Sequence, residues 1–424
     1  MNTKNLNEWL TYLEQLHPTE IELGLTRIGK VAKELEVTHF DAKVITVAGT
    51  NGKGTTCAFL EEILIQAGYK VGVYSSPHIQ RYTERLRINK QEMPAALHCQ
   101  AFSEIEAMRG ETSLSYFEYV TLGCLLILKA QQCDFILLEV GLGGRLDATN
   151  VVESDVSVVT TISIDHVAWL GNDREKIGFE KAGVFRANKP VICGELDAPE
   201  SLKAHAQNIN ADIRYAGKDF NSIMGENNWS WQGKTSIKNL PLTLMPMQNA
   251  STALAVIEAL QLNLSSDLLI NAIGHAQLAG RLQKIKMAGE FTQADQLDTY
   301  LDVAHNPESA TYLASQLTLL RQSGAKIFAI VGMLEDKDIS GTFSTINKQI
   351  DQYNLIPLNC YRGASQQTLL KHYQTSNDQG ADVHCFDTIK DAYKNILTVA
   401  QKSDIIIVFG SFYTVSDFLT LSQG

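Results

Sequence analysis

A glycine-rich segment with a lysine and neighbouring threonines lies between a predicted strand, residues 44–50, and a predicted helix, residues 57–67. It reads AGTNGKGTT over residues 48–56. Backbone N–H groups of such a loop, aided by the helix N-terminus, can bind phosphate. Lys53 would neutralise terminal phosphate charge, and the Thr55 hydroxyl could ligate Mg²⁺. A plain glycine turn is the alternative, but lysine, threonine and context together predict a nucleotide-phosphate loop.

This segment, called the phosphate loop below, departs from the usual G-K-[ST] pattern because Gly54 separates Lys53 from Thr55. Its glycines would allow positive φ and close backbone approach to a phosphate. The residues predicted to contact the nucleotide are Thr50, Asn51, Gly52, Lys53, Gly54 and Thr55.

Polar clusters follow three further predicted strands. They are residues 75–78 (SSPH), Glu139 with the glycine-rich stretch after it, and residues 165–166 (DH). Ligands of open parallel sheets bind at the carboxyl ends of the strands, so these clusters are candidates for one crevice. The alternatives are an N-cap before a proline-started turn at 75–76, a helix cap at Glu139 or its pairing with Arg145, and a turn with a helix N-cap at 165–166. The predicted cation ligands are Thr55, Ser76, Glu139 and His166.

Other candidate residues have weaker local signals. Asp302 and His305 follow a predicted strand and could bind ribose or a cation and take part in proton transfer, although an Asx-type turn is the alternative. Arg281 could reach a nucleotide phosphate or pair with a surface acid. By residue type alone, Lys181 is most typical of a surface or salt-bridged lysine.

The elements that would position these residues alternate between strands and helices. Because the strand candidates are continuous apolar runs, they favour parallel sheets buried on both faces. The expected fold class is α/β, with a P-loop-type, mostly parallel sheet domain at 1–285 and a smaller Rossmann-like α/β domain at 286–424. Polar residues 283–298 predict the boundary, and residues 219–243 predict a small β excursion. The strand candidates are 44–50, 70–76, 135–140, 156–163, 190–194, 300–303, 326–332 and 404–410.

Composition excludes several classes of protein. Lys+Arg is 36 and Asp+Glu is 47, so the net charge of −11 argues against a nucleic-acid partner. Small anions would need local groups, among them Lys53, Arg281 and the basic run Arg81, Arg85 and Arg87. Seven dispersed cysteines, no apolar leader and no long apolar stretch predict a cytoplasmic protein without disulfides or a membrane span.

Nine motifs in order resemble the folylpolyglutamate synthases of the Mur ligase superfamily, in particular the form that is also a dihydrofolate synthase. The extra glycine at position 54 is typical of this family. The motifs are VAGTNGKGTT, YSSPHIQRYTERLRIN, EVGLGGRLDATN, SIDH, WLGNDREKIGFEKAGVFR, GR at 280–281, LDVAHNP, GMLEDKD and FGSFYTV.

The resemblance implies an ATP-dependent ligase that adds L-glutamate to dihydropteroate and to reduced folates through an acyl phosphate. It implies ATP and two Mg²⁺ sites as cofactors, with Lys181 carbamylated to an anion that helps to organise the metal. Asn249 would contact adenine, and Arg281 and Asp302 would contact ATP on closure of the two domains. The residues expected to take part in catalysis are Lys53, Lys181, His166 and His305.

The resemblance also implies where the other substrates bind, and it implies a monomer. The pterin would lie near residues 20–23 and 146–148 and near Ser115, whereas His305 and Ser411 would lie on the amino-acid side. The individual residues are Glu20, Ile21, Glu22, Leu23, Ser115, Leu146, Asp147, Ala148 and Ser411.

Two other functions compete with this interpretation. A cell-wall Mur-type amino-acid ligase would use the same chemistry, but only 48 residues precede Gly49, which is too few for the UDP-binding domain expected there. A catalytically inactive nucleotide-binding regulatory protein would not be expected to keep Lys53, Glu139, His166 and Lys181 together.

Overall fold

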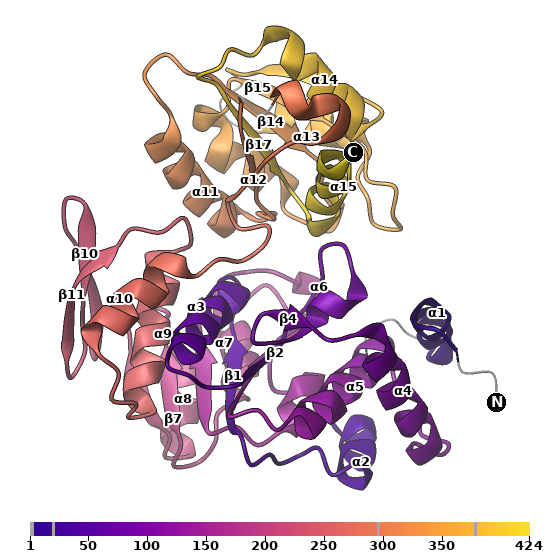
Figure 1. The fold of residues 1–424 in the computed structure, drawn as a ribbon, viewed down its shortest axis with the longest axis vertical. Coiled ribbons are helices and arrows are strands. Elements are labelled where there is room, and N and C mark those ends of the chain that lie inside the picture. The colour runs from indigo at the N-terminus through magenta and orange to yellow at the C-terminus, as the bar shows by residue number, and fades with distance from the viewer. Residues whose placement is uncertain (1–3, 19–21, 295–296, 377–379) are drawn as a thin grey trace. The chain divides into compact units, whose positions relative to one another are not determined.

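The computed structural model describes residues 4–18, 22–294, 297–376 and 380–424, and it divides into two compact units (Figure 1). The first unit is Met1–Gln277 and the second is Leu278–Gly424. The predicted boundary followed residue 285, but strand β12 (Gln283–Ile285) pairs with β13 (Asp298–Leu301) of the second unit. Residues 283–298 were expected to form a polar linker, and the described ones instead contribute a strand and the 3-10 turn η3 (Gly289–Ala294).

In the described part of the first unit, the main sheet has eight strands in the order β4-β3-β2-β5-β1-β6-β7-β8. The six from β2 to β8 in that order are parallel, whereas β3 and β4 are antiparallel at one edge. The strands are β1 (Lys43–Ala48), β2 (Val71–Tyr74), β3 (Leu86–Ile88), β4 (Gln91–Glu92), β5 (Phe135–Glu139), β6 (Val156–Val159), β7 (Pro190–Cys193) and β8 (Asp212–Tyr215).

Helices connect these strands and cover the sheet. The last five residues of β1 and all five of β5 are buried, as expected for parallel strands covered on both faces. Val44 and Ala48, on one face of β1, belong to the hydrophobic clusters of the first unit. The helices are α1 (Leu6–Leu16), α2 (Thr26–Glu34), α3 (Lys53–Gln66), α4 (Ala95–Met108), α5 (Tyr116–Gln131), α6 (Val167–Leu170), α7 (Arg174–Ala182), α8 (Glu200–Asn208), α9 (Met247–Ala259) and α10 (Ser266–His275), with 3-10 turns η1 (Tyr82–Arg85) and η2 (Ala148–Val151).

The predicted β excursion forms a small antiparallel sheet in the order β11-β10-β9. Its strands are β9 (Asn221–Met224), β10 (Asn228–Gln232) and β11 (Ser236–Pro241). Trp229 and Trp231 of β10 are almost fully buried, and the Trp231 indole donates a hydrogen bond to the Ser251 carbonyl on α9, 3.1 Å away. The excursion is therefore anchored to the same unit.

The sheet of the second unit has six strands among the described residues, in the order β12-β13-β17-β14-β15-β16, and all except β12 run parallel. Buried apolar runs such as IFAIV and IIIVF form its centre. The further elements are β14 (Ile327–Val331), β15 (Gln352–Leu355), β16 (Asp382–Cys385), β17 (Ile405–Phe409), α11 (Pro307–Leu320), α12 (Ile339–Ile346), η4 (Asn347–Gln349), α13 (Gln366–Thr375), α14 (Ile389–Val399) and α15 (Phe412–Gln423).

Across the residues that the structure describes, no helix is long and apolar enough to cross a membrane.

A buried histidine predicts how the stability of the first unit depends on pH. His98 on α4 is fully buried, and neither ring nitrogen has a hydrogen-bond partner among the described residues. It packs edge-on against the Tyr82 ring, with ring centroids 5.1 Å apart. Burial lowers the pKa of His98 to about 4, although the nearby Met93 backbone opposes the shift.

Because the unfolded chain binds this proton below pH ~6.5 and the folded protein does not, stability falls as the pH drops through this window. From pH 7.5 to 5, His98 should cost about 2 kcal/mol of unfolding free energy. Urea unfolding of the wild type and of His98→Phe at both pH values measures this, with exposed His39→Asn as the control. Equal pH dependence in all three proteins would contradict the assignment to His98.

Candidate functional site

Two glycines set the shape of the phosphate loop. Gly49 has φ +150°, and a Cβ there would lie 1.8 Å from Thr160 Oγ1. Gly52 has φ +86°, forms the N-cap of α3, and leaves no room for a Cβ beside Asn249. Both positions therefore require glycine, and they direct the first turn of α3, with its N–H groups, toward the end of the loop.

Residues 160–163, called the supporting segment below, bind the phosphate loop by backbone and hydroxyl groups. The N–H of Thr50 donates to the Thr161 carbonyl at 2.8 Å, and the N–H of Asn51 donates to Thr161 Oγ1 at 3.1 Å. Thr50 Oγ1 donates to the Ser163 carbonyl at 3.0 Å and accepts from the Ser163 N–H at 3.0 Å. The backbone N–H groups of Thr50 and Asn51 are therefore bonded within the protein. Backbone donors for a phosphate would come from the N-terminus of α3.

Lys53 and Thr55 occupy the first turn of α3. The Lys53 ammonium donates to the carbonyls of Gly49 and Thr50, at 3.0 and 3.1 Å. Thr55 is buried; its hydroxyl donates to the Gly52 carbonyl and accepts from Asn249 Nδ2, at 2.6 Å. Asn249 thus packs against the phosphate loop, and its predicted adenine contact stays a prediction.

Glu139 ends β5 beside the phosphate loop. It is a register partner of Val47 in β1, and only 8% of it is exposed. Glu139 also acts on Cys57 of α3. Burial is the main cause that raises the pKa of the Cys57 thiol, and the negative charge of Glu139 is the second cause. The alternative pairing with Arg145 is wrong, since Arg145 binds Glu180 instead, at 2.8 and 3.1 Å.

A small cavity, open to solvent, joins four segments that are distant in sequence. The residues that matter here are Gly49, Lys53, Gly141, Asp165, His166 and Lys181, all of which line it.

Two of these lining residues have informative placements. Lys181 is in the last turn of α7 and only 3% exposed, so the interpretation as a surface lysine is wrong. His166 is exposed, has φ 52°, and forms the N-cap residue of α6 while its N–H donates to Asp165 Oδ1 at 2.7 Å. His166 therefore both precedes α6 as its N-cap residue and lines the cavity.

The donors near this cavity suit a hard cation. A buried hydroxyl, Thr55, and a buried carboxylate, Glu139, offer oxygen ligands of the type that Mg²⁺ prefers. Of the four predicted ligands, His166 lines the cavity, whereas Thr55, Glu139 and the half-buried Ser76 are not among its lining residues. No group of three or more His, Cys, Asp or Glu side chains in the described ranges could hold a metal alone. The oxygen donors fit the group, and the complete ligand set stays a prediction.

The glycine-rich stretch after β5 packs directly on α7, which carries Lys181. A Cβ on Gly144 would lie 2.8 Å from the Glu180 carbonyl, and one on Gly183 would lie 2.3 Å from Arg145 Cβ. The Arg145 N–H also donates to the Glu180 carbonyl at 2.7 Å. These contacts fix the end of α7 against the cavity wall.

Part of the predicted pterin-binding set comes together in the structure. The Gly24 N–H, next to Leu23, donates to the Leu146 carbonyl at 3.2 Å. Glu22 binds Arg27, which also donates to Glu118. Glu118 and Ser115 form the capping box of α5, so Ser115 lies close to the same network. Glu20 and Ile21 lie outside the described residues.

Asp147 and Ala148 are buried. The Asp147 carboxylate accepts hydrogen bonds from the N–H of Leu142 and from the N–H and hydroxyl of Thr149, at 2.7–3.0 Å. Burial raises its pKa, and these hydrogen bonds oppose the shift. The observed role of this side chain is to shape the loop, and its contact with substrate stays a prediction.

In the second unit, the sequence after β13 places Asp302 in a buried turn. Its carboxylate accepts from the N–H groups of Leu282 and Ala304, both at 2.8 Å. Burial raises the pKa of Asp302, while the Arg281 charge opposes this. Arg281 lies over the Phe412 ring, 5.6 Å from its centroid, and His305 Nδ1 lies 2.8 Å from the Val303 carbonyl. Arg281, Asp302 and His305 thus gather at one edge of the sheet.

Ser411 has a structural role that the sequence analysis missed. It is buried as the N-cap of α15, where its hydroxyl accepts from the Thr414 N–H at 3.0 Å. Its predicted contact on the amino-acid side stays untested.

Two arginines of the basic run are used inside the first unit. Arg81 pairs with Glu92, and Arg87 pairs with Glu61 at 2.7 Å.

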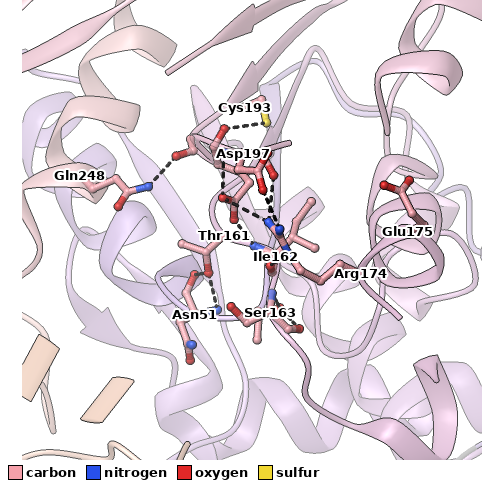
Figure 2. A network of polar contacts seen from close by, with 12 residues as sticks. Asn51, Thr161, Ile162, Ser163, Arg174, Glu175, Cys193, Asp197 and Gln248 are labelled. Atoms are coloured by element: carbon pink, nitrogen blue, oxygen red, sulfur yellow. Dashed lines mark hydrogen bonds and ion pairs between the residues drawn. The ribbon is translucent and has the colours of Figure 1, made fainter. Parts of the chain in front are cut away.

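Sequence reasoning also missed the charged residues behind the supporting segment. Figure 2 shows Arg174 and Asp197 close to Ile162, with Gln248 on the other side. Arg174 donates to the Ile162 carbonyl at 3.0 Å, and the Ile162 N–H donates to Glu195 Oε2 at 2.7 Å. The run of hydroxyl residues TTIS after β6 was the available signal, because hydroxyls that leave a strand end can bind a neighbouring loop.

Comparisons with known proteins agree with this site. The Mur ligase middle domain matches residues 47–260, and the Mur ligase glutamate ligase domain matches residues 280–412. The dihydrofolate synthase/folylpolyglutamate synthase of Escherichia coli K12 is 45% identical over 412 residues, which cover 97% of this chain and 94% of that protein.

Two solved structures are similar over nearly the whole chain. Escherichia coli FolC in complex with DHPP and ADP has a TM-score of 0.92 and 44% identity, covering 99% of this chain and 97% of that one. The bifunctional folylpolyglutamate synthase/dihydrofolate synthase from Yersinia pestis, complexed with AMPPNP and Mn ion, has a TM-score of 0.91 and 44% identity, covering 99% and 98%. From its phosphate loop, its two matched domains and these relatives, the chain belongs to the dihydrofolate synthase/folylpolyglutamate synthases of the Mur ligase family.

Proposed function

We propose that this protein is an ATP-dependent ligase that joins L-glutamate to dihydropteroate, forming dihydrofolate, and to reduced folates, forming folylpolyglutamates. The observation that supports this most directly is the cavity in which the phosphate loop meets Lys181 and His166. Relatives named for both activities align with almost the entire chain. That alignment favours folate substrates over the cell-wall peptides of other Mur-type ligases.

The proposed reaction has two steps. A carboxylate oxygen of the folate precursor attacks the γ-phosphorus of ATP, a new O–P bond forms, and the bond to ADP breaks. The amino group of glutamate then attacks the acyl carbon, an amide forms, and phosphate leaves with the electrons of the C–O bond. Phosphoryl transfer depends mainly on positioning and charge stabilisation. On the phosphate side, Lys53 and the N-terminus of α3, which follow the glycine loop directly, would supply both.

Divalent cations would supply further neutralisation of phosphate charge. Thr55, Ser76, Glu139 and His166 are the proposed ligands at two Mg²⁺ sites, and a relative solved with AMPPNP and Mn ion supports a divalent ion beside the nucleotide. Asn249, Arg281 and Asp302 are the proposed further nucleotide contacts.

We further propose that Lys181 is carbamylated. Lys181 is buried at the cavity wall, where the neutral amine can react with CO₂, forming a C–N bond and releasing a proton, to give a carbamate anion. An anion at this cavity wall would help to hold cations near the phosphates.

A product assay tests the proposed function. The protein is incubated with ATP, Mg²⁺ and L-glutamate, together with either dihydropteroate or tetrahydrofolate, and products are identified by mass spectrometry. One added glutamyl residue per ADP formed is expected with each substrate. No product and no substrate-dependent ADP release with either would refute the ligase, and would favour a nucleotide-binding regulatory protein.

Lys53→Ala should lower kcat by about 100-fold or more, because a preorganised positive charge on the transferring phosphate is removed. The folded structure should be kept, since the Lys53 ammonium donates to backbone carbonyls of its own loop, at Gly49 and Thr50. Lys203→Ala, at an exposed position on α8, is the matched control. Turnover of Lys53→Ala near that of the control would argue against a phosphate role.

Lys181→Ala should lose about 100-fold in kcat because the proposed anion is absent. Formate or acetate at high concentration should restore part of the activity by placing a carboxylate in the vacated space. Intact-protein mass spectrometry after trapping of the carbamate provides a second readout on the wild type. Full activity of Lys181→Ala without added carboxylate would show that no carbamate is needed.

A further inference from the structure

The supporting segment is bound from two sides, and only one side is the phosphate loop. Thr160 Oγ1 donates to the Asn51 carbonyl at 2.6 Å, and Thr161 and Ser163 bind Thr50 and Asn51 as described above. The residue between them, Ile162, has a buried apolar side chain, and its backbone N–H and carbonyl are bonded to Glu195 and Arg174. Its backbone points to the opposite side.

On that opposite side, a charged pair binds both backbone groups of Ile162 (Figure 2). Glu195 Oε2 accepts from the Ile162 N–H at 2.7 Å, and Arg174 Nε donates to the Ile162 carbonyl at 3.0 Å. Arg174 Nη2 and Glu195 Oε1 are 3.5 Å apart. Asp197 completes the network, because Arg174 donates to its carboxylate and to its carbonyl at 2.9 and 2.8 Å.

This pair connects three elements of the nucleotide site. Glu195 follows β7, Ile162 follows β6, and Arg174 is the first residue of α7, the helix that carries Lys181. Hydrogen bonds that include a charged group are shorter and stronger than neutral ones. The Glu195 side chain is only 14% exposed, which limits competition from water.

We propose that Glu195 and Arg174 are positioning residues for nucleotide binding. They hold Ile162, the supporting segment holds Thr50 and Asn51, and these hold the phosphate loop in its binding shape. Because Gly49 and Thr160 are in such close contact, a shift of the segment moves the loop with it. This inference rests on the proposed use of ATP, and it concerns residues that do not touch the nucleotide.

The test measures the affinity for Mg²⁺·AMPPNP by calorimetry in the full-length protein. Glu195→Gln keeps the shape of the side chain but removes its charge, and should weaken binding about tenfold, or about 1.4 kcal/mol. Glu258→Gln is the matched control, because Glu258 is 15% exposed and pairs with an arginine, Arg214, away from the supporting segment. Affinity of Glu195→Gln equal to that of the wild type would overturn the proposal.

A double-mutant cycle separates positioning from general stability. Thr161→Val removes the hydroxyl that accepts from Asn51. If Glu195 acts through this segment, the effects of Thr161→Val and Glu195→Gln on affinity are not additive. Additive effects, or a fall in melting temperature with unchanged affinity, would show a merely structural role. If Glu195→Gln does not fold, Glu195→Asp and Arg174→Lys replace it. The first shortens the side chain that accepts from the Ile162 N–H, and the second removes the Nε donor to the Ile162 carbonyl. Each should weaken nucleotide binding in the same way.

Measurements on the wild-type protein distinguish failure of the positioning proposal from failure of the proposed ligase function. Wild-type protein that binds the nucleotide and forms glutamylated product establishes the function whatever the variants do. Wild-type protein that binds the nucleotide but forms no product refutes the ligase and leaves the positioning test valid. Wild-type protein that does not bind the nucleotide overturns both.

Discussion

The close packing of the phosphate loop on the supporting segment is the constraint on which the nucleotide site depends. Gly49 approaches Thr160 so closely that no side chain fits between them, and hydrogen bonds from all three hydroxyl residues of the segment then connect it to Thr50 and Asn51. The first turn of α3 begins where these bonds end. This packing therefore sets the direction of the N–H groups at the N-terminus of α3, the part of a helix that binds anions.

The same packing explains how an acidic protein can present an anion site. With a net charge of −11, long-range attraction does not draw phosphate to the surface. Two arginines of the basic run, Arg81 and Arg87, are consumed by ion pairs with Glu92 and Glu61. Attraction must therefore be local, from backbone dipoles, Lys53 and cations bound beside them. Local attraction requires accurate placement, which is what the bonds from Glu195 and Arg174 to Ile162 provide.

Much of the fold was accessible from local patterns. Apolar runs such as VITVA and FILLE identified the central strands, because strands buried on both faces have no polar alternation. Local sequence patterns were less informative where tertiary packing determines whether a segment forms a strand or a side chain is buried. Residues 283–285 look like a linker but form an edge strand, since an antiparallel partner, β13, is available to them. The burial of Lys181 was equally hidden, because it results from the stretch around Gly144 packing on α7.

The types and order of the residues alone define the chemistry: a glycine loop with Lys53 and Thr55, then an acid, a histidine and a lysine after later strands. These are local properties, readable from spacing. The tertiary structure decided which of them meet, because Lys53 and Lys181, more than 100 residues apart in the chain, line one cavity only in the folded protein. It also decided the roles of Arg174 and Glu195, whose side chains have no local signature and act only through the backbone that the fold places between them.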